Sequence, residues 1–288
     1  MSARVVTLLV LSILAFTANP LLARLAVVTR EMDAMGYTGV RLASGALALL
    51  ALVWWRHRRA GSARLRIAGT WAGAASLFAY AITYSIGFLV IGAAVGSVIL
   101  FAAVQISILT WAMFKGDRPG PLEWTGLAIA FASLCYLVSP GLVAPDPLGS
   151  LLMIISGLAW AVYTLIGRGS RAPVDDTAGN FIRLLPISCA LITAGLFVQA
   201  PTALGLLYAI VSGAITSGLG YVIWYAVLPS ISRSRAAFVQ LTVPALAAFC
   251  AVIFLSEPLT LRLFVSSAGI LGGAAIALWA AGKRARAL

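Results

Sequence analysis

The chain has 288 residues, of which 62% are hydrophobic and 10% are charged. A water-soluble domain of this size could not hide so much apolar surface, so the composition excludes a soluble fold and indicates a protein surrounded by lipid. The net charge of +12 then fits basic loops on one membrane face better than nucleic-acid binding.

Ten segments are apolar enough to cross a bilayer, which takes about 20 residues. They cover residues 5–23, 34–55, 67–88, 92–114, 122–138, 148–167, 177–198, 204–228, 235–255 and 261–281. Because backbone in lipid must satisfy its hydrogen bonds within its own segment, we predict an all-α integral membrane protein with ten transmembrane helices. The first segment resembles a signal peptide, but no small-residue cleavage site follows it, so we expect a retained helix.

Basic residues are unevenly distributed between the two sets of loops. If the N-terminus is cytoplasmic, fifteen of the 20 Lys and Arg residues fall on the inner side. The outer side then has Arg24, Arg30 and Arg262, and two more arginines lie within predicted spans. Cytoplasmic loops carry such an excess. We therefore predict a multi-pass membrane protein with cytoplasmic N- and C-termini.

Short sequence matches recur in the same order in the two halves of the chain. Ser12-Ile-Leu-Ala-Phe16 matches Ser156-Gly-Leu-Ala-Trp160, Arg41-Leu42 matches Arg183-Leu184, and Asp117 matches Glu257. We predict two repeats, residues 1–144 and 145–288, with five helices each. Five is an odd number, so the second repeat enters the membrane with opposite polarity, and such 5+5 inverted repeats are typical of transporters.

These residues resemble the EamA-type branch of the drug/metabolite transporter superfamily over the whole chain. The most specific features are the repeated Leu-Ala-Phe/Trp motif, Arg41 and Arg183, Pro244, and the acidic residues Asp117 and Glu257. We expect gating or structural roles for Pro20, Arg41, Arg183, Pro244, Asp117 and Glu257. The resemblance implies a location in a bacterial inner membrane. It also implies a carrier that exports amino acids or other small metabolites, with aromatic amino acids favoured. Two departures are Val104, where the second repeat has Pro244, and Asp117, where glutamate is usual.

The first and sixth predicted helices offer polar and aromatic groups at corresponding depth. Pro20 frees a backbone carbonyl one turn back, and Asn19 can bind either a ligand or that carbonyl. Trp160 and Tyr163 are three residues apart and share a helix face. Lining of a substrate site is one interpretation; a kink capped by its own Asn, and packing of the rings against a neighbouring helix, are the alternatives.

Two tyrosine stripes suit a cavity that receives a flat apolar side chain. Tyr80 and Tyr84 lie at i, i+4 in the third predicted helix; the eighth has Tyr221 and Tyr225 at the same spacing, with Trp224 beside them. Rings on these faces could stack on a ligand or meet it edge-on. Aromatic side chains that face lipid are the alternative.

The fourth and ninth helices carry glutamines in apolar surroundings. Phe101 and Gln105 share one face of the fourth helix, and Gln240, Thr242 and Pro244 lie on the ninth, where the proline predicts a break. A glutamine at mid-bilayer needs a polar partner, so Gln105 and Gln240 are the preferred substrate anchors. Hydrogen bonds between helices, each worth about 0.6 kcal/mol, are the competing explanation.

Arg41 and Arg183 are intramembrane cations, which by default mark a functional site. An arginine can hold a substrate carboxylate through two hydrogen bonds. Both residues lie about two turns from a helix end, from where a long side chain can reach the interface. We favour a structural tie or gate over carboxylate binding.

The titratable residues limit the chemistry. No Asp or Glu lies in the middle of a predicted span, which favours uniport or exchange over proton antiport. One His and three scattered Cys give no metal-ligand spacing, so we expect no metal and no cofactor; the expected partners are a small-molecule substrate and lipid. The alternatives are a proton-coupled exporter of other metabolites or drugs, a scaffold, and a lipid-modifying membrane enzyme that uses Asp175 and Asp176, although that pair fits a helix cap better.

Overall fold

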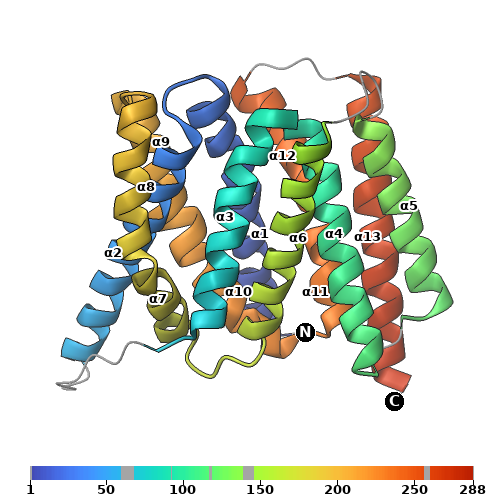
Figure 1. Ribbon diagram of the computed structural model, residues 1–288. Helices are drawn as coiled ribbons and strands as arrows, with labels where there is room; N and C mark the ends of the chain where they lie inside the picture. The colour runs from blue at the N-terminus through green and yellow to red at the C-terminus, as the bar shows by residue number, and fades with distance from the viewer. Residues whose placement is uncertain are drawn as a thin grey trace.

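The computed structural model describes residues 2–59, 68–91, 93–116, 119–138, 146–255 and 260–287. Within these ranges the chain folds into helices and short connections, without a strand, which confirms the all-α prediction. Figure 1 shows the helices as a bundle with both termini at one end. Asp117 and Glu257 lie outside the described residues.

The first half supplies five α-helices and a π-helical extension of the first. These elements are α1 (Ala3–Ala23), η1 (Arg24–Val28), α2 (Ala34–Arg59), α3 (Trp71–Ile91), α4 (Ala93–Phe114) and α5 (Pro121–Val138). The second half is more interrupted. It comprises α6 (Pro147–Gly167), α7 (Pro173–Arg183), α8 (Leu185–Val198), α9 (Ala203–Val211), η2 (Ser212–Leu219), α10 (Gly220–Val227), η3 (Leu228–Ser230), α11 (Arg233–Gln240), α12 (Val243–Leu255) and α13 (Leu261–Ala287).

Side-chain caps fix where several helices begin. Asp146 accepts a hydrogen bond from the Gly149 amide at 2.8 Å and precedes Pro147 at the first position of α6. Thr202 caps α9 through the Gly205 amide at 3.0 Å. Such caps satisfy amides that have no partner within the helix. Each of these caps therefore pairs one of the free amides at the start of its helix.

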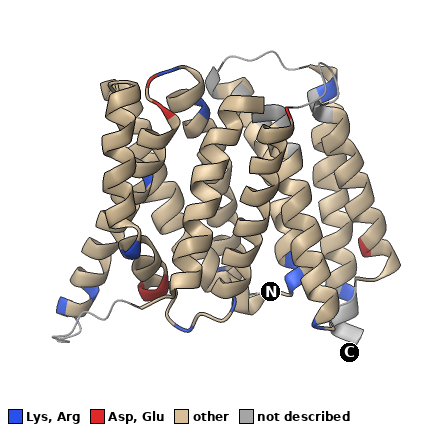
Figure 2. Ribbon diagram, in the orientation of Figure 1, with Lys and Arg blue, Asp and Glu red and all other residues tan. Residues whose placement is uncertain are grey.

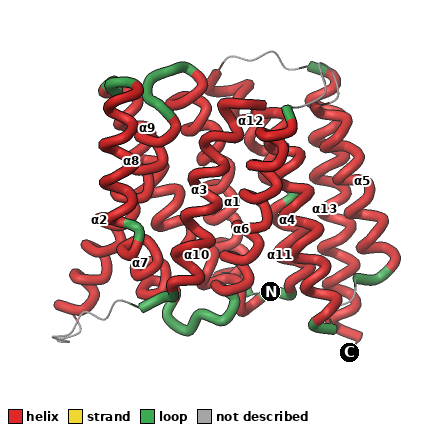
Figure 3. The backbone as a smooth tube through the Cα atoms, viewed as in Figure 1, coloured by secondary structure: helices red, strands yellow, loops and turns green. Residues whose placement is uncertain are grey.

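Several stretches are long and apolar enough to span a membrane. Among the described residues there are six such helical stretches, or seven if the bent pair α7–α8 forms one span. The count of ten transmembrane helices therefore stays a prediction. Figure 3 shows that the connections between the helices are short and lie mostly at the two ends of the bundle.

Two predicted helices are broken in the structure. The segment expected at 177–198 bends by 48° between α7 and α8. The break falls at Leu184, because Pro186 in the first turn of α8 cannot donate a backbone hydrogen bond back to α7. The segment expected at 235–255 breaks at Leu241 and Thr242, next to Pro244. α4 is continuous through Val104. The proline-associated break that the sequence predicted thus occurs in one half only.

The helices α5 and α13 approach each other through a reciprocal pair of glycines at one edge of the bundle (Figure 1). A Cβ atom added at Gly126 would lie 2.5 Å from the Gly273 carbonyl oxygen, and one added at Gly273 would lie 2.5 Å from the Gly126 carbonyl oxygen. Small residues permit this proximity of backbones. Two repeats related by an approximate twofold axis would make such a contact. The division of the chain into repeats at residue 144 stays a prediction.

Charged residues gather at the ends of the bundle. Figure 2 shows most of the Lys and Arg residues at the end that holds both termini. The last turn of α2, with Arg56, His57, Arg58 and Arg59, belongs to this end. This distribution agrees with the basic face expected from the sequence. That the face is cytoplasmic stays a prediction.

The glycine contact can be tested with neighbouring substitutions on α13. Gly273→Ala places a methyl group against the backbone of α5, and overpacking of this kind costs about 1–3 kcal/mol. Gly272→Ala is the matched control, because nothing lies within 4 Å of its added Cβ. We expect thermal unfolding in detergent to shift downward for Gly273→Ala alone. Equal unfolding temperatures for the two variants would contradict the described packing.

Candidate functional site

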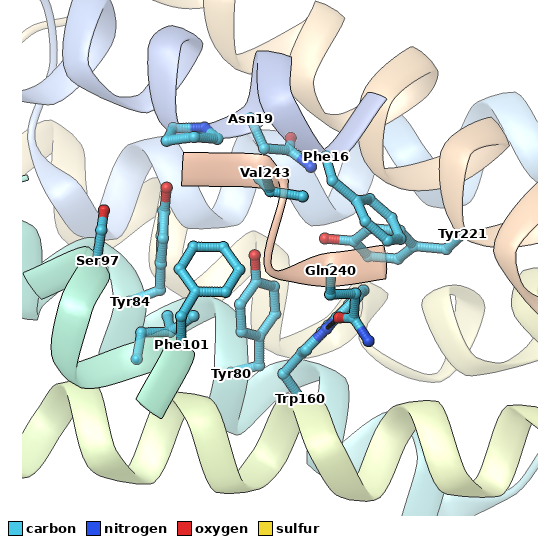
Figure 4. A pocket seen from close by; sticks show the side chains of 12 residues that line it. Phe16, Asn19, Tyr80, Tyr84, Ser97, Phe101, Trp160, Tyr221, Gln240 and Val243 are labelled. Atoms are coloured by element: carbon cyan, nitrogen blue, oxygen red, sulfur yellow. Dashed lines mark hydrogen bonds between the residues drawn. The ribbon is translucent and has the colours of Figure 1, made fainter. Parts of the chain in front are cut away.

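A cavity of about 50 Å³ lies inside the bundle, where helices of both halves meet. Its walls come from seven helices: α1, α3, α4, α6, α10, α11 and α12. The lining residues are Phe16, Asn19, Pro20, Tyr80, Tyr84, Ser97, Leu100, Phe101, Trp160, Tyr221, Gln240 and Val243. Figure 4 shows their side chains converging from different helices on one space.

Trp160 is the centre of an aromatic cluster. Its ring centroid lies 4.8 Å from that of Tyr221, 4.9 Å from that of Tyr80 and 5.3 Å from that of Phe16, the last at an interplanar angle of 89°. Such tilted and edge-to-face contacts are favourable because a ring's positive edge meets a negative face. Trp160 is 6% exposed, so it does not belong to an interfacial belt.

Two amides give the apolar cavity polar groups in fixed orientations. The indole nitrogen of Trp160 donates to Gln240 Oε1, and Gln240 Nε2 donates to the Ala236 carbonyl at 3.3 Å. Asn19 Oδ1 accepts from the hydroxyls of Ser212, at 3.0 Å, and Thr216. Asn19 therefore links α1 to η2. These hydrogen bonds are made to another helix and not to the backbone freed by Pro20 in α1.

Eight of the predicted residues line this cavity. They are Asn19, Pro20, Tyr80, Tyr84, Phe101, Trp160, Tyr221 and Gln240. Both tyrosines of the α3 stripe therefore reach the cavity, whereas the α10 stripe reaches it through Tyr221 alone. Whether these residues bind a substrate stays a prediction.

Three predicted aromatic residues lie behind the cavity wall. Tyr163 packs against Trp160 with a centroid distance of 5.7 Å, and Tyr225 donates its hydroxyl to the Tyr163 carbonyl at 3.0 Å. The Trp224 ring lies 5.3 Å from that of Phe16. All three are buried. They support the lining residues and do not themselves line the cavity.

Gln105, Thr242 and Pro244 are also absent from the lining. Gln105 Nε2 donates to the Ala237 carbonyl at 2.6 Å and so links α4 to α11. Thr242 donates its hydroxyl to the Val239 carbonyl at 2.7 Å, inside the break before α12. The preference for Gln105 as a substrate anchor is therefore not supported by its position, because its amide serves the helix–helix contact that was the competing explanation.

Four lining residues were not singled out from the sequence. Phe16 was noted only as part of the duplicated motif. Ser97 lies one turn before Phe101 on α4, so the i, i+4 spacing could have indicated it, and Leu100 is adjacent to Phe101. Val243 lines the cavity because the helix break beside Pro244 turns the backbone there. No side-chain pattern marks it.

The two intramembrane arginines differ in their surroundings. Arg41 does not use its length to reach an interface: it is 1% exposed and donates to the Ser217 hydroxyl at 2.9 Å and to the Tyr221 hydroxyl at 2.8 Å. Arg183 is half-buried and donates to the carbonyls of Ala68 and Gly179. Arg183 is a structural tie, whereas Arg41 belongs to the wall behind the cavity.

Polar ties join the two halves at the end of the bundle that holds the termini. The Asp176 carboxylate accepts from the Gly69 amide at 3.0 Å and from the Ser170 hydroxyl at 2.6 Å. Asn180 Oδ1 accepts from the Thr70 amide at 3.0 Å. The helix cap that the sequence suggested is not formed, because the N-cap of α7 is Ala172 and no side chain caps this helix. Asp175 and Asp176 lie in its first turn, and the Asp176 carboxylate binds a partner in the other half of the chain.

A corresponding set of ties lies at the opposite end. The Thr202 amide donates to the Glu31 carbonyl at 2.9 Å, and the Thr202 hydroxyl donates to the Glu31 carboxylate. The Gln199 side chain donates to the Arg30 carbonyl. At each end a connecting segment of one half is bound to the other half, and the cavity lies between the two sets.

The part of the chain that the structure describes contains no candidate metal-binding site. No three His, Cys, Asp or Glu side chains there lie close enough together to hold an ion. The cavity wall itself is made of aromatic, aliphatic, amide and hydroxyl side chains.

The structure is an apolar helical bundle with an internal cavity, and comparison with known proteins gives its class, a membrane transporter, and its family. Residues 147–279 match the EamA-like transporter family. The chain is 43% identical to an uncharacterized protein of Pseudomonas aeruginosa over 96% of this chain and 94% of that protein. It is 30% identical to the threonine/homoserine exporter RhtA of Salmonella typhimurium over 80% of this chain and 76% of that protein.

The fold is shared with a solved structure. A crystal structure that is 18% identical in sequence matches 98% of this chain and 99% of its own chain with a TM-score of 0.79. The chain therefore belongs to the EamA-like transporter family, within the drug/metabolite transporter superfamily, and is a multi-pass membrane protein. The family resemblance seen in the sequence is confirmed.

The hydrogen bond between Trp160 and Gln240 can be tested by changing the indole alone. Trp160→Phe keeps an aromatic ring and leaves Gln240 Oε1 without its donor, which costs about 1–3 kcal/mol for a buried group. Trp279→Phe is the control, because Trp279 is 56% exposed near the end of α13. We expect a lower unfolding temperature in detergent for Trp160→Phe only. Equal effects of the two substitutions would argue against this contact.

Proposed function

We propose that this protein exports amino acids with large apolar side chains, aromatic ones in particular, across a bacterial inner membrane. The observation that carries the proposal is the central cavity, whose walls combine rings of Tyr80, Trp160 and Tyr221 with the amide of Gln240. Rings accept a flat side chain through stacked or edge-on contacts. The amide and the phenol hydroxyls offer hydrogen bonds to the polar end of an amino acid.

The transport cycle that we propose is alternating access. A cavity of about 50 Å³ is far smaller than the roughly 300–1,000 Å³ of drug-sized ligand pockets, so a substrate has to separate the walls when it enters. The polar ties at the two ends of the bundle suit gates that open in turn. An inverted repeat provides two similar gates around one central site.

The proposed energetics are uniport or exchange. The residues that line the cavity are uncharged side chains, and a proton-driven carrier commonly places a titratable group on the transport path. Net export would then follow the concentration gradient of an accumulated metabolite. A pH gradient that proved indispensable for transport would contradict this part of the proposal.

A second candidate substrate class is favoured by one relative. RhtA carries the name of a threonine/homoserine exporter and is 30% identical to this chain. Gln240 and the Ser97 hydroxyl at the cavity wall could bind a hydroxylated side chain. The number of rings around the cavity favours the larger apolar amino acids over these small polar ones.

Substrate class can be determined by counterflow into liposomes that contain the purified protein and are preloaded with unlabelled phenylalanine or tryptophan, without an ion gradient. We expect accumulation of labelled external phenylalanine. Tyr80→Ala should reduce it by about tenfold or more, since stacking and ring burial are worth on the order of 1–3 kcal/mol. Tyr136→Ala is the control, because Tyr136 lies 47% exposed on α5. Counterflow with threonine and homoserine but not phenylalanine would select the second candidate.

The gate at the end that holds the termini can be tested by hydrogen exchange. Asp176→Asn weakens the charged acceptor of the Gly69 amide, and hydrogen bonds to charged groups contribute about 1.5–3 kcal/mol. We expect exchange at residues 68–70 to rise about tenfold or more, which corresponds to about 1.4 kcal/mol. Asp175→Asn is the matched control, because Asp175 Oδ1 has no hydrogen-bond partner. Unchanged exchange in Asp176→Asn would contradict the assignment of this tie.

A further inference from the structure

Arg41 is a buried cation that the transport cycle proposed above does not use. It lies on α2, is 1% exposed, and ranks among the largest fully buried side chains of the described protein. Its Nε donates to Ser217 and its Nη2 donates to Tyr221. Its Nη1 has no hydrogen-bond partner. A guanidinium has five N–H donors, so these two bonds leave donors unused.

Within the described residues, no Asp or Glu side chain forms an ion pair with Arg41; the partners of its guanidinium are neutral. Its Cζ lies 5.6 Å from the centre of the Tyr80 ring and 5.8 Å from that of the Tyr84 ring. Cation–π contacts of this kind offset only part of the cost of burying a charge. A fixed positive charge inside a membrane protein therefore remains uncompensated by the protein around it.

Three cavity-lining tyrosines separate this charge from the cavity. Arg41 contacts Tyr80, Tyr84 and Tyr221, all of which line the cavity. Because the Tyr221 oxygen already accepts from Arg41, its own proton is directed to a different acceptor. The Tyr84 hydroxyl is buried and has no partner. Figure 4 shows the hydroxyls of Tyr80 and Tyr221 directed into the space between the helices.

We propose that this tyrosine wall, with the Arg41 charge behind it, is a subsite for a carboxylate of the transported molecule. The phenol hydroxyls donate hydrogen bonds to the carboxylate oxygens, and the guanidinium balances their charge through the wall. In a low-dielectric interior a charge one side chain away acts strongly. The inference rests on the proposed function in one respect, namely that a substrate occupies the cavity.

The subsite predicts which analogues the protein rejects. Phenylalanine has the carboxylate, whereas phenylalaninamide and phenethylamine keep the ring and the amino group without it. We expect each of these analogues to compete with labelled phenylalanine in counterflow at least about tenfold more weakly than phenylalanine does, because each loses charged hydrogen bonds. Competition equal to that of phenylalanine would overturn the proposal while leaving amino-acid export intact.

A pair of tyrosine variants separates the subsite from a merely structural effect. Tyr84→Phe removes an unpartnered hydroxyl of the cavity wall, and Tyr163→Phe removes an equally unpartnered hydroxyl behind it. We expect Tyr84→Phe to raise the half-saturating phenylalanine concentration by about fivefold with little effect on competition by phenethylamine. Tyr163→Phe should alter neither, and equal effects of the two variants would overturn the proposal.

The role of the Arg41 charge is tested with one variant that removes the positive charge and one that keeps it. Arg41→Gln should abolish the preference for phenylalanine over phenylalaninamide, and Arg41→Lys should retain part of it. A preference that survived in folded Arg41→Gln would overturn the role of the guanidinium. If these variants do not fold, the tyrosine pair still decides.

A failure of phenylalanine counterflow would reject the proposed substrate without rejecting the subsite. The purified wild-type protein is then tested for thermal stabilisation by threonine, homoserine and benzoate, each against its amide, in chloride and in chloride-free buffer. Stabilisation by carboxylates and not by amides supports the subsite. Stabilisation by chloride but not by carboxylates, or no stabilisation by either, overturns the proposed carboxylate subsite.

Discussion

Lipid offers no hydrogen-bond partner, and the fold is organised by that constraint. Backbone that leaves regular helical geometry has to be covered by protein. In the described structure the π-helical stretch η2 has buried residues along its length, among them Ser212, Thr216 and Ser217. These hydroxyls are the groups that hold Asn19 and Arg41. The irregular helix is thus the place where α1, α2 and the second half of the chain are joined by polar contacts.

The aromatic cluster depends on this framework. Trp160 contacts rings from α1, α3 and α10, and its indole nitrogen is bound by Gln240 on α11. A change in the position of any of these helices therefore moves several rings together. Close packing transmits small shifts in this way because interiors have few voids. The cavity is small in this structure because the same rings that line it contact one another.

Much of the architecture was predictable from the sequence. The lengths of the apolar segments predicted the helices. The i, i+4 tyrosines predicted the cavity-facing side of α3, and one tyrosine of the α10 pair, Tyr221, also reaches the cavity. The proline rule gave the break before α12, since Pro244 cannot donate a backbone hydrogen bond. These predictions rest on local backbone chemistry and on periodicity, and neither requires knowledge of which helices are neighbours.

The remaining site residues depend on neighbours. Arg41 lies about two turns from a helix end, and whether it reaches the interface depends on helix depth and on the hydroxyls of η2, which no spacing reveals. Gln105 and Gln240 are the same residue type in similar surroundings, yet only Gln240 reaches the cavity. The Gln105 amide donates to the Ala237 carbonyl of the neighbouring α11, whereas Gln240 accepts from the Trp160 indole at the cavity. Burial of a polar group predicts a partner but does not identify it.

The reciprocal glycine contact between α5 and α13 has a consequence for the direction of movement. Each helix presents the same groups to the other: a glycine carbonyl and, one turn on, an alanine amide. A seam with identical chemistry on both sides opposes tilting equally in either sense. For the proposed carrier, α5 and α13 could then tilt about this contact in both directions, and the contact itself would favour neither direction of transport. The solute concentrations on the two sides of the membrane would then decide which way the net flow runs.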